Sequence, residues 1–384
     1  MEVFWLFLQK LTHGVRTFPG KVCRNLSYGI CRSIFNMDKG GTALSVTIKE
    51  IAEYTGTSRG TVDKVIHDRP GVKPETRQKI QVAIKALNYQ PNIIGKALVL
   101  KNNPIKIGII VSPDYNYYIQ QVMLGIHGAE QEYAPFGIKV DVHILQSLTV
   151  EEELILLNKL ESDDYAGIGV FPFDDIRIRD KLNALSDSGI AVVTFNSQVD
   201  DLRQLCFIGQ DHYQAGRAAG SLIQRIIAPT DSVAVLISSM NISCHEQRLK
   251  GFSDKLSENS PLICIVDVME EYDDDQKSYD CTLDLCRRYP ELSAIYITSG
   301  GSVGVCKAIK KLHREENIKV ISHDMSPQAL PYLKSGLIAF SIEQNGYDQG
   351  YQVVKVLFEY LIKCQKCKEA FIQAPLKIIT EELI

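Results

Sequence analysis

From Ile105 onward, short apolar runs alternate with segments long enough to form helices. The runs are rich in Ile and Val and are apolar at nearly every position, as in strands that a parallel sheet buries on both faces. The pattern predicts an α/β body of two doubly wound, Rossmann-like lobes. The expected strands are Ile105–Val111, Ile138–Leu145, Gly167–Phe171, Ala191–Phe195, Cys206–Gly209, Ser232–Ile237, Ile263–Val268, Ala294–Thr298, Val320–Ser322 and Leu376–Thr380.

A purely helical pattern precedes this body. Thr47 and Glu50 form a Thr-x-x-Glu capping box at the start of a short helix that Gly56 ends. Ser58 caps a second helix, and Pro74 suits the first turn of a third. Two short helices joined by a turn that contains Gly predict a helix-turn-helix within a small three-helix bundle. Its apolar positions repeat at helical spacing and are Ile48, Ile51, Ala52, Val62, Val65, Ile66, Ile80, Ala83, Ile84 and Leu87.

Charge separates this helical unit from the body. The chain carries a net charge of −4, but residues 45–103 hold ten Lys or Arg against five Asp or Glu, and residues 1–44 hold six against two. The rest of the chain therefore carries −13. A basic segment on an acidic body is typical of a nucleic-acid-binding head, because attraction to phosphate is needed only at the contact surface. Chance clustering of solvated charge is the alternative interpretation.

The second helix of a helix-turn-helix lies in the major groove of DNA, where residues near its start reach base edges. Arg59 can donate two hydrogen bonds to guanine, and Lys64 lies on the same polar face. Gly60 offers no side chain, and Asp63 would repel phosphate unless a neighbouring cation pairs with it. The residues of this unit predicted to contact DNA are Thr57, Ser58, Arg59, Gly60, Thr61 and Lys64.

This segment resembles the headpiece of the lactose-repressor (LacI/GalR) family without gaps for about fifty residues, through Val46–Ala52, Ser58–Ile66, Val72–Ile80 and Asn88–Asn92. The resemblance implies that Arg59, Gly60 and Lys64 fall where the family reads bases. It also implies that the protein binds a palindromic double-stranded DNA operator as a homodimer.

The segment Asn92–Leu98 resembles the hinge helix of the same family. By that resemblance Leu98 enters the minor groove, a use to which apolar side chains between base steps are suited. Asn92 and Lys96 are added to the predicted DNA contacts, with Lys96 on phosphate. Gly95 lowers the helix propensity by about 0.8–1 kcal/mol, which predicts a loose hinge. A plain linker is the alternative.

Polar residues follow the expected strands of the body. In doubly wound sheets ligands bind at the carboxyl ends of the strands, so two facing lobes predict a cleft between them. Asn, Asp, Arg and Gln side chains beside aromatic rings suit a sugar or a sugar-like polyol, because paired hydrogen bonds bind its hydroxyls while its C–H faces stack. The expected ligand contacts are Tyr115, Tyr117, Tyr118, Asp175, Asn196, Asp324 and Gln344 at the strand ends, and Arg248 after the Ser238–Cys244 loop.

Residues 105–384 resemble the type I periplasmic binding proteins, the effector domain of the same regulator family. The resemblance implies ligand contacts from six of these residues: Tyr117, Tyr118, Asn196, Arg248, Asp324 and Gln344. Ser299–Gly301 departs from the Asn-Asp that sugar binders often carry. Two structural alternatives stay open, namely a salt bridge between Arg248 and Asp324, and a tyrosine pair that merely fills the core.

Together these patterns predict four segments. Residues 1–44 are expected to be a disordered extension or to follow an upstream translation start. Residues 45–91 are expected to form the DNA-binding headpiece, and residues 92–103 the hinge. Residues 104–384 are expected to form the effector-binding domain, with one lobe from about 104–209 and 345–373 and the other from about 210–344 and 374–384.

Nothing in the sequence indicates an enzyme. It lacks G-x-S-x-G, Walker and H-E-x-x-H motifs, and its eight His show no paired spacing. The ten Cys lack a disulfide framework, which favours a reducing cytoplasm, and Cys364-x-x-Cys367 is assigned no role. We therefore expect a cytoplasmic transcription regulator, with repression favoured over activation, and without cofactor, metal or membrane contact. The solute-binding protein of a sugar transporter, a sugar-metabolising enzyme and a ligand-insensitive regulator are the rivals.

Overall fold

The computed structural model describes residues 46–66, 71–89, 93–113 and 116–383. The expected extension at 1–44 and two predicted contact residues, Asn92 and Tyr115, lie outside these ranges. Contacts divide the chain into one unit that ends at Asn92 and another that begins at Ile93. Each unit is described by itself.

The first unit contains three short helices around a small core: α3 (Ile48–Thr55), α4 (Arg59–Ile66) and α5 (Pro74–Ala86). Both hydrogen bonds of the capping box are present, because Glu50 N donates to Thr47 Oγ1 and Thr47 N donates to Glu50 Oε2. Gly56 ends α3 in the left-handed conformation, with φ of 63°. The predicted apolar stripes meet in the core, whose buried members are Ile51, Ala52, Val62, Val65, Ile80 and Ala83.

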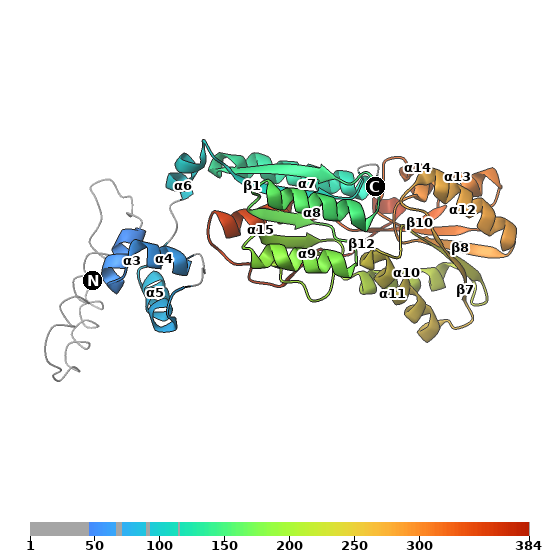
Figure 1. The fold of residues 1–384 in the computed structure, drawn as a ribbon. Helices are drawn as coiled ribbons and strands as arrows, with labels where there is room; N and C mark the ends of the chain where they lie inside the picture. Colours follow the sequence, from blue (N-terminus) through green and yellow to red (C-terminus); the bar gives the residue numbers. More distant parts are fainter. Residues whose placement is uncertain (1–45, 67–70, 90–92, 114–115, 384) are drawn as a thin grey trace, which may run out of the picture. The chain divides into compact units, whose positions relative to one another are not determined.

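The second unit begins with helix α6 (Ile93–Leu100) and continues into two six-stranded sheets (Figure 1). The first lobe has the strand order β11-β5-β4-β3-β1-β2, and all of its pairs are parallel. Its elements are β1 (Ile105–Val111), α7 (Tyr117–Tyr133), η1 (Ala134–Phe136), β2 (Ile138–Ile144), α8 (Val150–Ser162), β3 (Gly167–Val170), α9 (Ile176–Asp187), β4 (Ala191–Phe195), β5 (Cys206–Gly209), α15 (Gly346–Leu361) and β11 (Phe371–Gln373).

The second lobe has the order β12-β10-β9-β8-β6-β7, in which only the β10–β12 pair is antiparallel. Its elements are α10 (His212–Ile226), β6 (Ser232–Ile237), α11 (Ser243–Asn259), β7 (Cys264–Glu270), α12 (Asp275–Arg288), β8 (Leu292–Ile297), α13 (Ser302–Lys311), β9 (Lys319–His323), α14 (Leu330–Lys334), β10 (Ile338–Glu343), β12 (Lys377–Ile379) and η2 (Glu381–Leu383).

The chain passes between the lobes three times: after β5, after β10 and between β11 and β12. The expected strands coincide with those of the structure to within a few residues at each end. Strands β10 and β11 were not among them. The sequence of β10 mixes polar with apolar positions, and β11 has three residues, so neither has the continuous apolar run by which buried parallel strands are recognised.

Helices cover both faces of the first sheet. A Cβ on Gly167 or Gly169 would meet side chains of α15, whereas one on Gly108 would meet Leu160 of α8. Gly108 is in register with Ile168, which points opposite to Gly167 and Gly169. Helices α15 and α8 therefore lie on opposite faces, which explains why β3 and β4 are buried at every position.

Helices α7 and α15 approach each other more closely than side chains allow. A Cβ on Gly125 of α7 would lie 1.9 Å from the carbonyl oxygen of Tyr347, and one on Gly350 of α15 would lie 2.1 Å from that of Val122. The backbones touch at these two glycines. The pair α7–α15 therefore has no room to slide without separating.

We predict that Gly125→Ala destabilises the protein, because the new methyl group must push the backbone of α15 away. Overpacking of this kind costs about 1–3 kcal/mol, which lowers Tm by several degrees. Gly128→Ala on the same helix is the control, because its methyl group would meet only the hydroxyl end of the Tyr347 side chain, at 2.7 Å. Thermal unfolding followed by circular dichroism measures both. Equal Tm values for the two variants would contradict the proposed backbone contact.

Candidate functional site

Helix α4 presents the residues expected to read DNA. Arg59, Gly60 and Lys64 are exposed, while Val62 and Val65 face the headpiece core. The helix is therefore oriented as a recognition helix must be, with its apolar face inward and its basic residues outward.

The hydroxyl groups expected to bind phosphate also organise the start of α4. Ser58 Oγ accepts a hydrogen bond from Thr61 N at 3.1 Å and lies 2.8 Å from Thr61 Oγ1. Thr57 Oγ1 lies 2.8 Å from Oγ1 of the buried Thr55. Ser58 thus caps α4, as its sequence position predicts. The predicted phosphate contacts of these three residues stay a prediction.

Helix α6 lies within the segment expected to be the hinge. Leu98 and Val99 are 72% and 79% exposed, so two large apolar side chains face solvent on an eight-residue helix. The side chain of Lys96, in contrast, points toward the body of the protein. Its ammonium donates to the carbonyl oxygens of Leu361 at 2.9 Å and Ile362 at 3.1 Å. The expected contact of Lys96 with phosphate would require these two hydrogen bonds to break.

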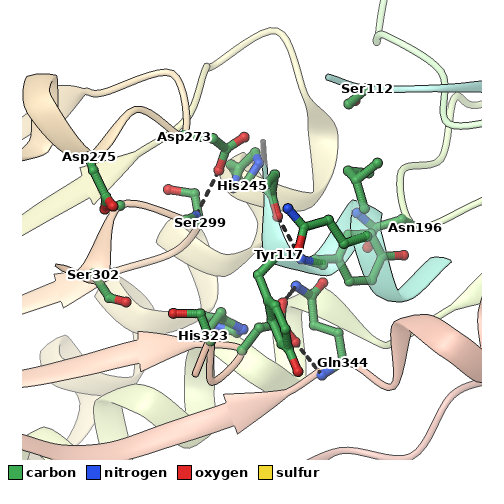
Figure 2. Close-up of a pocket in the computed structure, with 18 of the residues that line it drawn as sticks. Ser112, Tyr117, Asn196, His245, Asp273, Asp275, Ser299, Ser302, His323 and Gln344 are labelled. Atoms are coloured by element: carbon green, nitrogen blue, oxygen red, sulfur yellow. Dashed lines mark hydrogen bonds between the residues drawn. The ribbon is translucent and has the colours of Figure 1, made fainter. Parts of the chain in front are cut away.

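The carboxyl ends of strands from both lobes surround a cavity of about 250 Å³, which we call the interlobe cleft (Figure 2). The first lobe contributes residues after β1, β3 and β4, and the second lobe residues after β6, β7, β8, β9 and β10. Six of the expected ligand contacts line it: Tyr117, Tyr118, Asn196, Arg248, Asp324 and Gln344. This is the position at which doubly wound sheets bind ligands.

Arg248 is the centre of the hydrogen-bond network in the cleft. Its side chain is almost fully buried, at 1% exposure. The guanidinium donates to the carbonyl oxygen of Thr298 at 2.6 Å, to Nδ1 of His212 at 3.1 Å and to Oε1 of Gln344. Gln344 in turn donates through its backbone and its side-chain amide to the two carboxylate oxygens of Asp324. Gln344 therefore bridges Arg248 and Asp324, in place of the direct salt bridge that the sequence left open.

Burial and the charge of Arg248 set the protonation of the groups around it. Both causes lower the pKa of His212, His245 and His323, so that these imidazoles are neutral near pH 7. Burial, followed by the charge of Glu343, raises the pKa of Asp324 to about 7. Among the described residues that line the cleft, Arg248 is therefore the one permanent cation, and no histidine is charged near pH 7.

The two tyrosines have different surroundings. Tyr118 is buried, and its hydroxyl donates to Oε1 of Gln349 at 2.9 Å. Tyr117 is only partly buried and lies beside the cavity in Figure 2. The alternative of a core tyrosine thus applies to Tyr118 more than to Tyr117. Tyr117 is the ring available to stack on a ligand.

Asn196 contributes an acceptor from the first lobe. It follows β4 in the left-handed conformation, with φ of 58°, and its Oδ1 has no hydrogen-bond partner among the described residues although it is buried. Its carbonyl oxygen accepts instead from His212 of the second lobe. Asn196 thereby joins the two lobes, while its amide oxygen is buried without a partner among the described residues.

The sequence analysis did not identify Asp273 and Asp275, two acidic residues that line the cleft. Asp273 follows β7, and its carboxylate accepts from Ser238 Oγ at 2.8 Å and from Gly300 N at 2.7 Å. A Cβ on Gly300 would lie 2.9 Å from Oδ1 of Asp273, so the small residue leaves the space that this carboxylate occupies. The same rule of polar residues after a strand would have found Asp273. The other lining residues missed include Ser112, Asn116, His245, Ser299 and His323.

Asp175 corrects an expectation. It does not line the cleft but caps α9, where its Oδ1 accepts from Arg177 N at 2.8 Å and its carboxylate pairs with the Arg177 guanidinium. Acidic residues favour helix N-termini, which explains this use. The loop before it is held by Glu153, whose Oε2 accepts from Phe173 N at 2.9 Å.

A basic helix-turn-helix unit and a two-lobed body with a polar cleft define the class of ligand-responsive DNA-binding proteins. The chain matches the periplasmic binding protein domain over residues 107–364 and the lacI family of bacterial regulatory proteins over residues 47–92. The chain belongs to the periplasmic binding protein domain family and carries a lacI-family DNA-binding domain ahead of it.

Two named regulators are similar to most of this chain, and one solved structure is similar to its body. Catabolite control protein A of Priestia megaterium is 24% identical over 87% of this chain and 98% of its own length. The HTH-type transcriptional regulator MalR of Streptococcus pneumoniae serotype 4 is 25% identical over 73% of this chain and 84% of its own. GanP, a glucose-galactose binding protein from Geobacillus stearothermophilus, shares the fold of the body, with a TM-score of 0.67, 24% identity and coverage of 73% and 98%.

The protein is therefore a DNA-binding transcriptional regulator and not an enzyme, as the sequence predicted. The solute-binding rival shares only the body, and the lacI-family match decides against it. In the described part of the chain, no group of three or more His, Cys, Asp or Glu is placed to hold a metal ion. No described helix combines the length and the apolar character that crossing a membrane requires.

The buried Glu153 generates a pH prediction. Burial raises its pKa from 4.5 to about 8, and its Oε1 lacks a hydrogen-bond partner among the described residues. The folded protein thus holds a proton that the unfolded chain releases near pH 4.5. The stability from this group is present below that pH and is lost as the pH rises through 8.

We predict that Glu153→Gln, which cannot ionise, reduces the fall in Tm between pH 5 and pH 9 by a few degrees. The exposed Glu291→Gln is the control and should keep the fall seen in the unmodified protein. Differential scanning calorimetry at the two pH values measures all three proteins. A Glu153→Gln offset that is the same at both pH values would contradict an ionisable role.

Proposed function

We propose that this regulator is a cytoplasmic, homodimeric repressor that binds a palindromic operator and is released from it when a sugar or polyol binds in the interlobe cleft. Two identical heads related by a two-fold axis match two half-sites, which is the physical reason for a palindrome. Effector and operator affinities are then reciprocally coupled. Buried thiols such as Cys244 and Cys306 fit a reducing compartment.

The observation that carries the effector part is a set of buried, unpartnered polar atoms on residues that line one cavity. Asn196 Oδ1, Arg248 Nε and His323 Nδ1 have no hydrogen-bond partner among the described residues, and all three residues line the cleft. Buried polar groups are almost always hydrogen-bonded, so such a cluster supports a bound polar ligand as the missing partner. A ligand with both hydroxyl donors and oxygen acceptors has the chemistry that these three atoms require.

The charged residues of the cleft favour a neutral ligand over an anionic one. Asp273, Asp275 and Asp324 line the cleft together with the guanidinium of Arg248. Burial raises the pKa of Asp273, and raises that of Asp324 to about 7, so these two carboxyl groups carry only part of a negative charge near pH 7. Arg248 already donates to three protein acceptors, so little of its charge is available to an anion. A phosphorylated sugar or a sugar acid would therefore find no uncommitted cation among the described lining residues, whereas the hydroxyl groups of a neutral sugar can donate to the carboxyl oxygens.

The size of the cleft supports the same class. Its volume of about 250 Å³ lies just below the range of roughly 300–1,000 Å³ that is typical of small-molecule pockets. This volume suits a monosaccharide or a cyclic polyol better than an oligosaccharide. The name of the glucose-galactose binding protein that shares this fold is in keeping with that choice.

We predict that a neutral pentose, hexose or inositol raises the Tm of the full-length protein, whereas glucose 6-phosphate does not. A ligand at 100 times its Kd contributes about 2.7 kcal/mol to the folded state. Tyr117→Ala should weaken the shift because it removes the partly buried ring of the cleft. Leu124→Ala is the control, since Leu124 is exposed on the same helix and does not line the cleft. A shift with the phosphorylated sugar alone would refute the neutral-polyol proposal.

A second prediction concerns Arg59. We expect Arg59→Ala to lower the ratio of affinities between a duplex selected by the protein from a random library and a scrambled duplex, by about 5- to 150-fold, because a bidentate contact to guanine discriminates by roughly 1–3 kcal/mol. The exposed Lys85→Ala on α5 should leave that ratio unchanged. Fluorescence anisotropy on both duplexes measures it. Equal loss of affinity on the two duplexes would show that Arg59 binds phosphate and does not read a base.

A further inference from the structure

The ammonium of Lys96 occupies the C-terminal end of helix α15. The last carbonyl groups of a helix lack partners within it and carry a partial negative charge, so a cation placed there is stabilised. Lys96 meets two of these groups, at 2.9 Å from Leu361 O and 3.1 Å from Ile362 O, across 265 and 266 positions of sequence. The hinge helix α6 is thereby attached to α15.

Apolar contacts hold the hinge helix at the same place. Leu100 packs over Gly137 so closely that a Cβ there would lie 2.4 Å from the Cβ of Leu100. The neighbouring Phe136 of η1 lies with its ring centroid 5.8 Å from that of Phe358, in the last turn of α15. Helix α6 therefore packs in a defined position against η1 and the end of α15.

The other end of α15 begins at the interlobe cleft. Gln349, in its first turn, donates to the carbonyl oxygen of Gln344 at 2.8 Å and accepts from the hydroxyl of Tyr118 at 2.9 Å. Both partners line the cleft. Helix α15 has 16 residues, so it spans roughly 24 Å between the cleft and the hinge.

The helix can transmit a displacement because it has little freedom of its own. The backbone contacts at Gly125 and Gly350 join it to α7, which carries Tyr117 and Tyr118. A shift of Gln344 or Tyr118 therefore moves the carbonyl groups that bind Lys96. Closely packed elements move together in this way, since their interfaces do not deform continuously.

We propose that Lys96 is a positioning residue that fastens the hinge helix to the effector cleft through α15. Its ammonium serves this intramolecular site and not a DNA phosphate. The proposal rests on the proposed function, because the connection is useful to a regulator only if a ligand that moves Gln344 changes the position of the helix that carries Leu98.

The first test is hydrogen exchange of the backbone amides of residues 93–100 in the full-length protein, without DNA or sugar. Lys96→Met should accelerate their exchange about tenfold or more, because it removes two hydrogen bonds from a charged donor. Lys96→Arg should restore much of the protection, since a guanidinium also donates to carbonyl groups. The exposed Lys101→Met is the matched control and should leave the exchange unchanged. Unchanged exchange in Lys96→Met would overturn the proposal.

A change at the far end of α15 tests the connection. Gln349→Met removes the hydrogen bonds to Gln344 and Tyr118 and should also accelerate exchange of residues 93–100. Combined with Lys96→Met, it should add less than its separate effect, because both changes act on one connection. Full additivity, or no effect of Gln349→Met on the hinge amides, would overturn the role of α15.

The competing phosphate role has a distinct signature. A lysine on phosphate contributes about 0.9 to the slope of log affinity against log salt concentration. Lys96→Met should leave this slope unchanged on the selected duplex, and a slope reduced by about 0.9 would overturn the proposal. The exchange experiment contains no DNA. If the unmodified protein bound no duplex, the regulator function would therefore be refuted, while the exchange rates would still decide whether Lys96 fastens the hinge helix.

Discussion

The burial of Arg248 is the constraint on which the arrangement of the cleft depends. A guanidinium removed from water is tolerated only when protein acceptors replace its hydration. The acceptors come from three places in the second lobe: the end of β8 through Thr298, the start of α10 through His212 and the end of β10 through Gln344. A change in any of these elements would therefore alter the contacts of Arg248. Burial, together with the charge of Arg248, keeps the neighbouring histidines neutral.

The same network leads out of the cleft. Gln344 connects Arg248 to Asp324, and its carbonyl oxygen is bound by Gln349 of α15. From there one continuous helix, backed by α7, ends at the carbonyl groups that bind Lys96. Coupling between a ligand site and a hinge requires an element that both sites bias, and α15 has the required contacts at its two ends.

Much of the fold follows from local pattern. The headpiece helices start at Thr47 and Ser58 because capping requires only near neighbours in sequence, and the buried strands are recognisable because both of their faces are apolar. The rule that ligands bind at strand ends led to Asn196, Asp324 and Gln344, all of which line the cleft. The same rule led to Asp175, which caps α9, since capping and ligand binding use the same residue types at the same place in the chain.

The sequence by itself determined the class of protein, the two kinds of domain, the order of most elements and the orientation of the recognition helix. Each of these depends on residues a few positions apart. Only the tertiary structure decided that Asp273 occupies the space left by Gly300, that Gln344 separates Arg248 from Asp324, and that Lys96 binds the end of α15. These contacts join residues between 20 and 265 positions apart, and no periodicity or spacing in the chain encodes which of many polar side chains will meet once the sheets have formed.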